Sequence, residues 1–214
     1  PVLLARDDDQ ESVADILLQL IDTKLSKVSD FELSFYDHQS SSLAGLSQSF
    51  ITSARLDNLL SCFLGASALT SSKPEQPAIL VCTDHEEVGS ASTSGAAGTF
   101  LASTLRHLTG DQNTSDAIMQ KSMLVSADNA HALHPNYPNK HDENHGPIIN
   151  AGPVIKINAN QRYASNSETS AAFRAICAKA NVPVQTFVTR ADMACGSTIG
   201  PITATKLGVP TVDV

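Results

Sequence analysis

The chain has 214 residues, of which 42% are hydrophobic and 17% charged, and its formal net charge at pH 7 is −8. This length and composition are typical of a globular domain with a buried core and argue against an intrinsically disordered chain. The negative charge argues against a nucleic-acid partner, because phosphate binding needs a basic face. An acidic substrate remains compatible, because a single lysine can select a carboxylate within an acidic protein.

Membrane and secretion signals are not found in the sequence. No apolar run approaches the roughly 20 residues that cross a bilayer, so neither a transmembrane helix nor a membrane partner is expected. No basic segment precedes an apolar one at the start, so no signal peptide is predicted. The four cysteines (Cys62, Cys82, Cys177 and Cys195) form no CxxC pair and are expected to be free thiols. These features predict a cytoplasmic protein.

The first part of the chain shows the apolar spacing of a helix and then the alternation of a strand. Helical spacing of apolar residues over 11–27 predicts a helix with one buried face, and strict alternation over 31–35 predicts a half-buried strand. The Ser- and Gly-rich residues 40–49 predict a loop. A Leu- and Ala-rich helix is predicted over 58–69, followed by a Pro-containing linker over 71–77.

Strands and helices then alternate to the end of the chain. Strands are predicted at 78–82, 122–125, 154–157, 184–188 and 210–214, helices at 96–108, 168–180 and 200–207, and a long loop at 134–147. This order predicts an α/β fold, a three-layer αβα sandwich around a mixed, mainly parallel sheet. In such sheets, functional sites lie in the loops at the carboxyl ends of the strands.

Acidic residues occupy three of those loop positions. Asp57 precedes a helix, Glu86 and Glu87 follow strand 78–82, and Asp128 follows strand 122–125. Each has an ordinary explanation, as a helix cap, a solvated surface pair and an Asx turn respectively. Together, however, they should converge at one sheet edge, where like charges are costly unless a cation holds them. One glutamate can then bind a metal ion while its neighbour acts as general base.

These motifs also occur in a familiar order. The stretches are Phe-Glu-Leu-Ser-Phe-Tyr-Asp at 31–37, Ala-Arg-Leu-Asp-Asn-Leu at 54–59, Asp-His-Glu-Glu-Val-Gly-Ser at 84–90, Ser-Ala-Asp-Asn-Ala-His-Ala-Leu-His-Pro-Asn-Tyr at 126–137, Gly-Pro-Val-Ile-Lys at 152–156, Gln-Arg-Tyr-Ala-Ser at 161–165 and Cys-Gly-Ser-Thr-Ile-Gly-Pro-Ile at 195–202. From about residue 30 to its end, the chain resembles the aspartyl aminopeptidase family of two-metal zinc exopeptidases.

The resemblance implies a set of metal ligands. Asp57 would bridge two divalent ions, Glu87 would bind one of them and Asp128 the other, and Glu86 would be the general base. Zn²⁺ is the first expectation, with Mn²⁺ or Co²⁺ as alternatives. The resemblance also implies a homo-oligomer.

The resemblance places His131, Lys156 and Tyr163 around the N-terminal residue of a peptide substrate. A lysine ammonium and a tyrosine hydroxyl can both donate to the side-chain carboxylate of an N-terminal Asp or Glu. A neutral residue would leave the lysine desolvated and unpaired, so the expected activity is removal of acidic N-terminal residues. The ordinary alternatives are that Lys156 extends to solvent and that Tyr163 is a core residue.

The chain departs from the family pattern in two respects. The family needs two histidine ligands in segments that are not found here and that are expected before Pro1 and after Val214. A second, β-rich domain is also largely absent. We therefore expect residues 1–214 to form an incomplete catalytic core that is inactive by itself.

Two other functions remain open. One is a two-metal aminopeptidase or deacylase of different specificity, which would share the metal ligands but not the acidic preference. The other is a non-catalytic homologue that acts as an assembly module.

Overall fold

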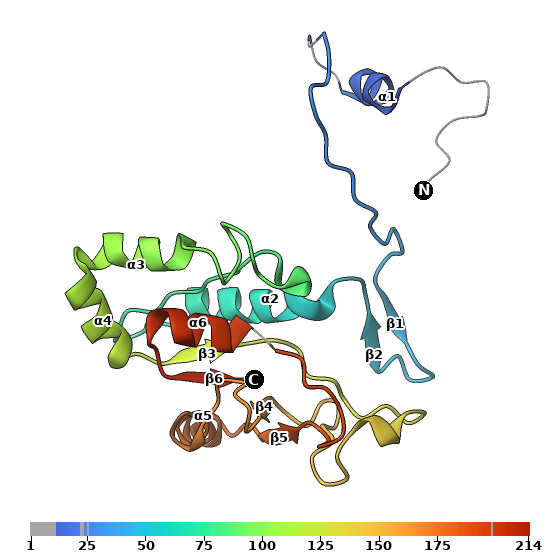
Figure 1. Ribbon diagram of the computed structural model, residues 1–214. Coiled ribbons are helices and arrows are strands. Elements are labelled where there is room, and N and C mark those ends of the chain that lie inside the picture. The colour runs from blue at the N-terminus through green and yellow to red at the C-terminus, as the bar shows by residue number, and fades with distance from the viewer. Residues whose placement is uncertain (1–11, 22–23, 25, 198) are drawn as a thin grey trace. The chain divides into compact units, whose positions relative to one another are not determined.

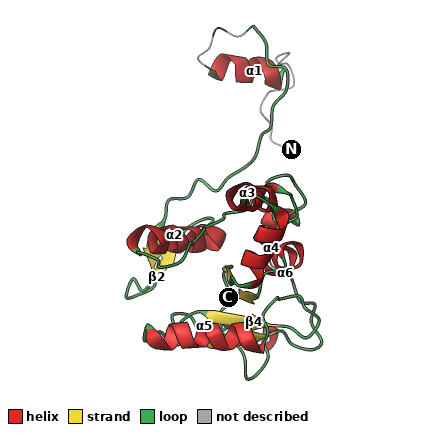
Figure 2. Ribbon diagram, turned by 90° about the vertical axis from the view of Figure 1, so that its left-hand side faces the viewer, coloured by secondary structure: helices red, strands yellow, loops and turns green. Residues whose placement is uncertain are grey.

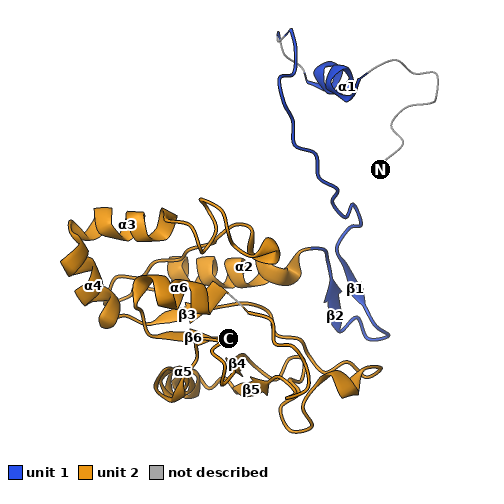
Figure 3. Ribbon diagram, viewed as in Figure 1, with its two compact units in different colours: residues 1–54 blue, residues 55–214 orange. Residues whose placement is uncertain are grey.

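The computed structural model describes residues 12–21, 24, 26–197 and 199–214. The chain forms two compact units, Pro1–Ala54 and Arg55–Val214 (Figure 3). The prediction of one catalytic core over 1–214 spans both units and stays a prediction. Within the described part of the chain, no helix is long and apolar enough to cross a membrane.

The first unit begins with helix α1 (Val13–Leu20). Its start is a capping box, in which the Ser12 hydroxyl accepts from the Asp15 backbone N–H at 3.2 Å and the Asp15 carboxylate accepts from the Ser12 N–H at 3.3 Å. The helix is shorter than the predicted 11–27, because Ile21 has an extended backbone (φ −92°, ψ 114°) and ends it. Residues 11, 22, 23 and 25 of that prediction lie outside the described residues.

The prediction of a strand at 31–35 is wrong. These residues have no regular structure, and Leu33 and Phe35 are 59% and 85% exposed. A strand needs a paired neighbour, and alternation of side chains alone does not supply one.

A short hairpin lies where a loop was predicted. Its strands, β1 (Ser42–Ala44) and β2 (Phe50–Thr52), pair antiparallel. The Ser42 and Thr52 hydroxyls lie 2.8 Å apart across it, and Gly45 takes the positive φ (85°) that begins its turn. The loop prediction for 40–49 therefore holds only for the turn.

The second unit contains the predicted alternation of helices and strands (Figure 1). Its helices are α2 (Leu56–Ser71), α3 (Phe100–Thr109), α4 (Gln112–Gln120), α5 (Ser167–Lys179) and α6 (Ile199–Leu207). Its strands are β3 (Leu124–Ser126), β4 (Val154–Ile157), β5 (Gln185–Val188) and β6 (Thr211–Asp213). Most predicted elements are confirmed to within two residues. The helix predicted from residue 96 starts later, and α4 was not predicted, although Asp111 caps its Thr114 N–H at 3.0 Å.

The strands form two parallel pairs, β3 with β6 and β4 with β5, and β4 also lies beside β6. Helix α5 lies on one side of these strands and α6 on the other (Figures 1 and 2), which confirms the α/β layering. Ile155 of β4 and Val212 of β6 are fully buried between the helix layers. Among the described residues of the second unit, these four strands form two separate two-stranded sheets and not one continuous hydrogen-bonded sheet.

The apolar segment 78–82 is not a strand, contrary to the prediction. Within the described chain it has no ladder partner, and Ile79 is 57% exposed. The segment instead lies against α2, where a Cβ added at Gly65 would approach Cδ1 of Leu80 to 2.7 Å. Directly after it, Asp84 forms a single parallel bridge with Gly95.

Candidate metal and substrate site

Asp57 lies at the start of α2, where the backbone is not helical. Arg55 is left-handed (φ 60°), Asp57 itself has φ −86° and ψ 110°, and the Asp57–Asn58 peptide is cis. No backbone N–H among the described residues is found to donate to the Asp57 carboxylate, so the helix-cap explanation has no support. The irregular turn instead leaves this carboxylate available to neighbouring segments.

Glu86 and Glu87 lie in a single 3₁₀ turn, Glu86–Val88. Left-handed residues flank it on both sides, His85 at φ 58° and Gly89 at φ 96°. A non-glycine residue with positive φ is uncommon and often occurs at functional sites. The His85 ring is held by the Ser92 hydroxyl, 2.8 Å from Nδ1.

Asp128 follows β3, as predicted. Its backbone N–H donates to Val214 O at 2.9 Å, which extends the pairing of β3 with β6 by one step. The Asp128 side chain is 20% exposed. It therefore lies at the carboxyl end of a parallel pair, the usual position of a functional side chain in this fold class.

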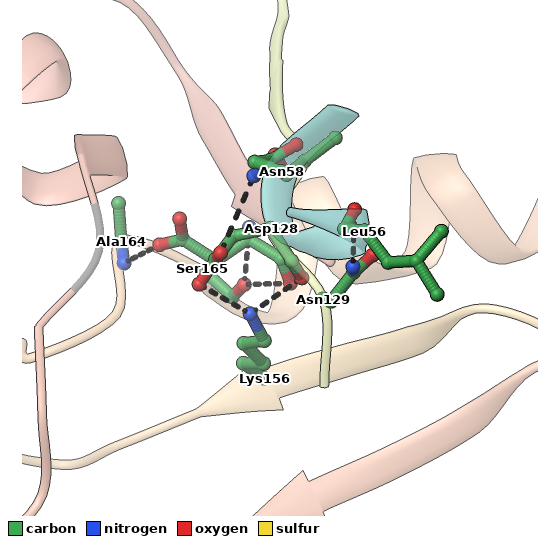
Figure 4. Close-up of polar contacts among 9 residues, drawn as sticks. Leu56, Asn58, Asp128, Asn129, Lys156, Ala164 and Ser165 are labelled. Atoms are coloured by element: carbon green, nitrogen blue, oxygen red, sulfur yellow. Dashed lines mark hydrogen bonds and ion pairs between the residues drawn. The ribbon is translucent and has the colours of Figure 1, made fainter. Parts of the chain in front are cut away.

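Two Asp-Asn dipeptides join these segments (Figure 4). Asn58 donates from Nδ2 to Ala127 O at 3.0 Å and to Asp128 Oδ1 at 3.3 Å. In the other direction, Asn129 donates from Nδ2 to Leu56 O at 3.1 Å. The sequence prediction assigned no role to these asparagines, although the repeat of Asp-Asn at 57–58 and 128–129 is a signal for them.

The carboxylates influence one another's ionisation. Burial raises the pKa of Asp57, and the charge and hydrogen bond of Asp128 and the charge of Glu87 add to this, while Lys156 acts in the opposite direction. Burial, followed by the charges of Asp128, Glu87 and Asp57, likewise raises the pKa of Glu86. The four acidic residues that the sequence singled out therefore lie near enough for their charges to interact.

Lys156 of β4 extends into this acidic group. Its Nζ lies 2.7 Å from the Asp128 backbone O and 3.0 Å from Asp128 Oδ2 (Figure 4). Because its side chain is only 5% exposed, the alternative in which Lys156 extends to solvent is wrong.

Tyr163 is also buried, at 8% exposure. The Lys156 ammonium lies 6.0 Å from its ring centroid, and the Phe187 ring packs against it edge-on at 6.3 Å. Burial and a hydrogen bond with Cys195 raise the Tyr163 pKa well above its usual value, so the phenol stays protonated at neutral pH. Phe187 and Cys195 were not predicted as parts of this site.

His131 is the one predicted site residue that is not seen at this cluster. It is exposed, and its backbone carbonyl lies 3.0 Å from Nε2 of His141. Within the described residues, no hydrogen bond or ion pair joins its imidazole to the carboxylates.

The donor set suits a divalent cation only in part. Carboxylate oxygens are ligands that Zn²⁺ accepts, and the nearby charges of Asp128 and Glu87 help to raise the pKa of Asp57, a repulsion that a bound cation would relieve. In the described part of the chain, however, no three His, Cys, Asp or Glu side chains are placed to hold one ion together. Asp57, Glu87 and Asp128 therefore do not form a complete set of metal ligands within the described residues.

A cavity of about 810 Å³ lies elsewhere in the second unit, between residues 133–148 and 190–192. His141, Asp142, Arg190 and Asp192 contribute to its wall, and none of the clustered carboxylates does. The acidic cluster therefore lies apart from the lining of this cavity.

Comparison with known proteins places these features in a family context. The family described as "Aminopeptidase I zinc metalloprotease (M18)" matches residues 5–214. A probable M18 family aminopeptidase 2 of Ectopseudomonas mendocina is 63% identical over 187 residues, which cover 87% of this chain and 44% of the relative. Its counterpart in Stutzerimonas stutzeri is 56% identical, covering 100% of this chain and 51% of the relative. The chain thus spans about half the length of the curated relatives it matches.

Solved structures agree with the fold. The Ape4 and Nbr1 complex contains a chain that is 41% identical and superposes with a TM-score of 0.75, covering 82% of this chain and 35% of that one. Yeast aminopeptidase 1 (Ape1) and the mApe1 dodecamer each give 26% identity and a TM-score of 0.71, covering 83% of this chain and 42% of theirs.

Proposed function

Because the chain belongs to the aminopeptidase I (M18) family of zinc metalloproteases, we propose that the whole protein carrying it removes acidic residues from the N-termini of peptides. The aspartyl aminopeptidases that the sequence resembles are members of this family. The observation that carries the proposal is the cluster in which the buried Lys156 ammonium meets the carboxylates at the end of β3.

Asp57, Glu87 and Asp128 are the residues that would hold two divalent ions, Zn²⁺ first. Their oxygen donors are of the right kind, and histidines from outside this chain would complete the two sites. Such ions would supply Lewis-acid chemistry, polarising the scissile carbonyl and lowering the pKa of a bound water toward neutrality.

Glu86 is proposed as the general base. It stands beside the ligand Glu87 in one tight turn, and its pKa is raised by burial and by the neighbouring carboxylates. A raised pKa makes a carboxylate a stronger base, better matched to taking a proton from water near pH 7 and returning it to the leaving amine.

The proposed acidic specificity comes from Lys156 and Tyr163. The ammonium has three hydrogens, and Asp128 takes two of them through its backbone oxygen and its carboxylate. The third can donate to the carboxylate of an N-terminal Asp or Glu, joined by the Tyr163 hydroxyl. His131 is proposed as a further contact that moves toward the substrate when it binds.

Assembly and location are also proposals. The mApe1 relative is a dodecamer, and by this likeness we propose a homo-oligomer. All four cysteines are free, which suits a reducing compartment and supports the proposed cytoplasmic location.

The test is hydrolysis of Asp-, Glu-, Ala- and Leu-anilide substrates by the whole protein, with and without a chelator. Cleavage of the acidic substrates alone, abolished by the chelator, is the expected result. If Leu- or Ala-anilide were cleaved as fast as the acidic substrates, the protein would still be an aminopeptidase, but the proposed acidic specificity would be refuted. Absence of any cleavage by the metal-loaded protein would favour a non-catalytic homologue.

A further inference from the structure

Strand β6 has two edges, and a different part of the candidate site lies along each of them. On one edge β6 pairs with β3, where the Val214 N–H donates to Ser126 O and Val214 O accepts from the Asp128 N–H, each at 2.9 Å. Backbone groups of successive residues in a strand point to opposite edges, so the N–H and C=O of Asp213 face away from β3. They are therefore directed to the edge where a further strand would normally pair.

The segment that contains Tyr163 occupies this second edge and replaces a strand there. The Ser165 hydroxyl accepts from the Asp213 N–H at 2.9 Å and donates more weakly to Asp213 O at 3.4 Å. In return, the Asp213 carboxylate accepts from the Ala164 N–H (Figure 4). Asp213 thus binds the two residues that directly follow Tyr163.

Burial makes these hydrogen bonds important for the position of the segment. Ser165 is 3% exposed and Asp213 is fully buried, so an Asp213 N–H without its acceptor would be an unpaired donor inside the protein. The Tyr163 ring is held close by, against Phe187 at 6.3 Å and 6.0 Å from Lys156 Nζ. A shift of the segment would therefore move the phenol relative to the ammonium.

We propose that Ser165 is a positioning residue for the acidic specificity. Through its bonds to Asp213 it holds the Tyr163 hydroxyl where the carboxylate of the substrate binds. The next residue of β6, Val214, binds the backbone of Asp128, so the substrate pocket and a proposed metal ligand are positioned by the same strand. The inference rests on the proposed acidic specificity and adds to it a residue that acts through Tyr163.

The experiment compares Ser165→Ala with wild type in the whole metal-loaded protein, using Glu- and Ala-anilide substrates. Loss of the hydroxyl should raise KM for Glu-anilide about 3- to 10-fold with kcat within about 2-fold, while KM for Ala-anilide and the zinc content stay unchanged. Ser170→Ala is the matched control. Ser170 is also buried (8% exposed), and its hydroxyl has no hydrogen-bond partner among the described residues, so this variant should behave as the wild type.

A double-mutant cycle with Tyr163→Phe tests whether Ser165 acts through the phenol. Because Tyr163→Phe removes the hydroxyl itself, adding Ser165→Ala to it should change KM for Glu-anilide by less than about 2-fold. The inference is overturned if the two effects multiply, if Ser165→Ala weakens both substrates equally, or if it leaves KM for Glu-anilide unchanged. A wild type without preference for Glu-anilide would instead refute the proposed specificity itself.

Ser165→Cys provides a second variant that keeps a polar atom at this position. Sulfur is a weak hydrogen-bond acceptor, so KM for Glu-anilide should rise by less than in Ser165→Ala. The same cycle can be measured with this variant if Ser165→Ala is not recovered as folded protein. A larger rise of KM in Ser165→Cys than in Ser165→Ala would point to packing and would overturn the inference.

Discussion

The ammonium of Lys156 and the carboxylate of Asp128 form a buried ion pair, with Nζ 3.0 Å from Oδ2. The sequence assigns Lys156 to substrate recognition and Asp128 to the metal, and the structure joins them directly. The same ammonium also holds the Asp128 backbone oxygen at 2.7 Å. The proposed substrate pocket and the proposed metal site are therefore in direct contact through Lys156 and Asp128. A substitution of either residue is expected to affect both sites.

Replacement of Lys156 by Met tests whether this lysine selects acidic substrates or only holds Asp128 in place. The variant loses the only cation found at the cluster among the described residues, so kcat/KM for Glu-anilide should fall about 100-fold or more while that for Ala-anilide changes far less. Lys206→Met is the matched control, because Lys206 donates to the Ala97 backbone O at 2.7 Å on an exposed surface. Equal losses on both substrates would show that Lys156 serves Asp128 alone.

Substitutions of the two glutamates in the 3₁₀ turn are expected to have different effects, loss of turnover at Glu86 and loss of zinc at Glu87. Glu86→Gln should retain its bound zinc and lose about 10²- to 10⁴-fold in kcat, as expected for removal of a general base. Glu87→Gln should lose zinc, measured by elemental analysis of the dialysed protein. The assignment would be reversed if Glu86→Gln lost zinc while Glu87→Gln kept it.

Acidification should stabilise the metal-free protein in the range where these carboxyls titrate. The pKa values of Asp57 and Glu86 are raised in the folded state, so the folded chain binds protons more readily than the unfolded chain. Their contribution to stability is therefore complete below the unfolded pKa of about 4 and is lost as pH rises through the raised folded values.

The melting temperature with chelator present should accordingly increase as pH falls from neutrality toward the unfolded pKa of about 4, and this increase should be smaller in Asp57→Asn. Asp111, Asp142 and Asp192 have lowered pKa values and act in the opposite direction, but only at more acidic pH. An unchanged slope in Asp57→Asn would contradict the carboxylate coupling.

The sequence predicted the second unit better than the first. Helices and strands of 122–214 follow strong local periodicity and are confirmed, because each apolar face finds a partner in the structure. Residues 31–35 and 78–82 carry equally clear patterns but have no ladder partner among the described residues, and a strand requires one. The hairpin at 42–52 was missed because each of its strands has only three residues, too few to show a clear alternation in a Ser- and Gly-rich segment.

Asp57 and Asp128 were predictable because each lies beside a regular element, α2 and β3 respectively, whereas Glu86 and Glu87 were placed after a strand at 78–82 that does not form. Residues that orient them were not, since Asn58 and Asn129 act across about 70 positions of sequence through amide contacts. Lys156 was predicted as a substrate residue, but its bond to Asp128 depends on the parallel arrangement of strands that meet only in the fold. Ser165 and Asp213 likewise meet through tertiary contacts that no local pattern encodes.

Helix α6 packs closely against β6, and this packing holds Asp213 in place beside the Tyr163 segment. Substitution of two glycines, Gly200 and Gly196, tests the importance of this packing. Asp213 is fully buried, and its carboxylate accepts from the Ala164 backbone N–H beside Tyr163. A Cβ added at Gly200 would overlap that carboxylate, whereas at Gly196 nothing lies within 4 Å. Gly200→Ala should therefore lower the free energy of unfolding by about 2–4 kcal/mol, and Gly196→Ala should change it by less than about 1 kcal/mol. Chemical denaturation of both variants measures the difference. If α6 can shift without disturbing Asp213, the two variants will unfold alike, and Tyr163 will not depend on this contact.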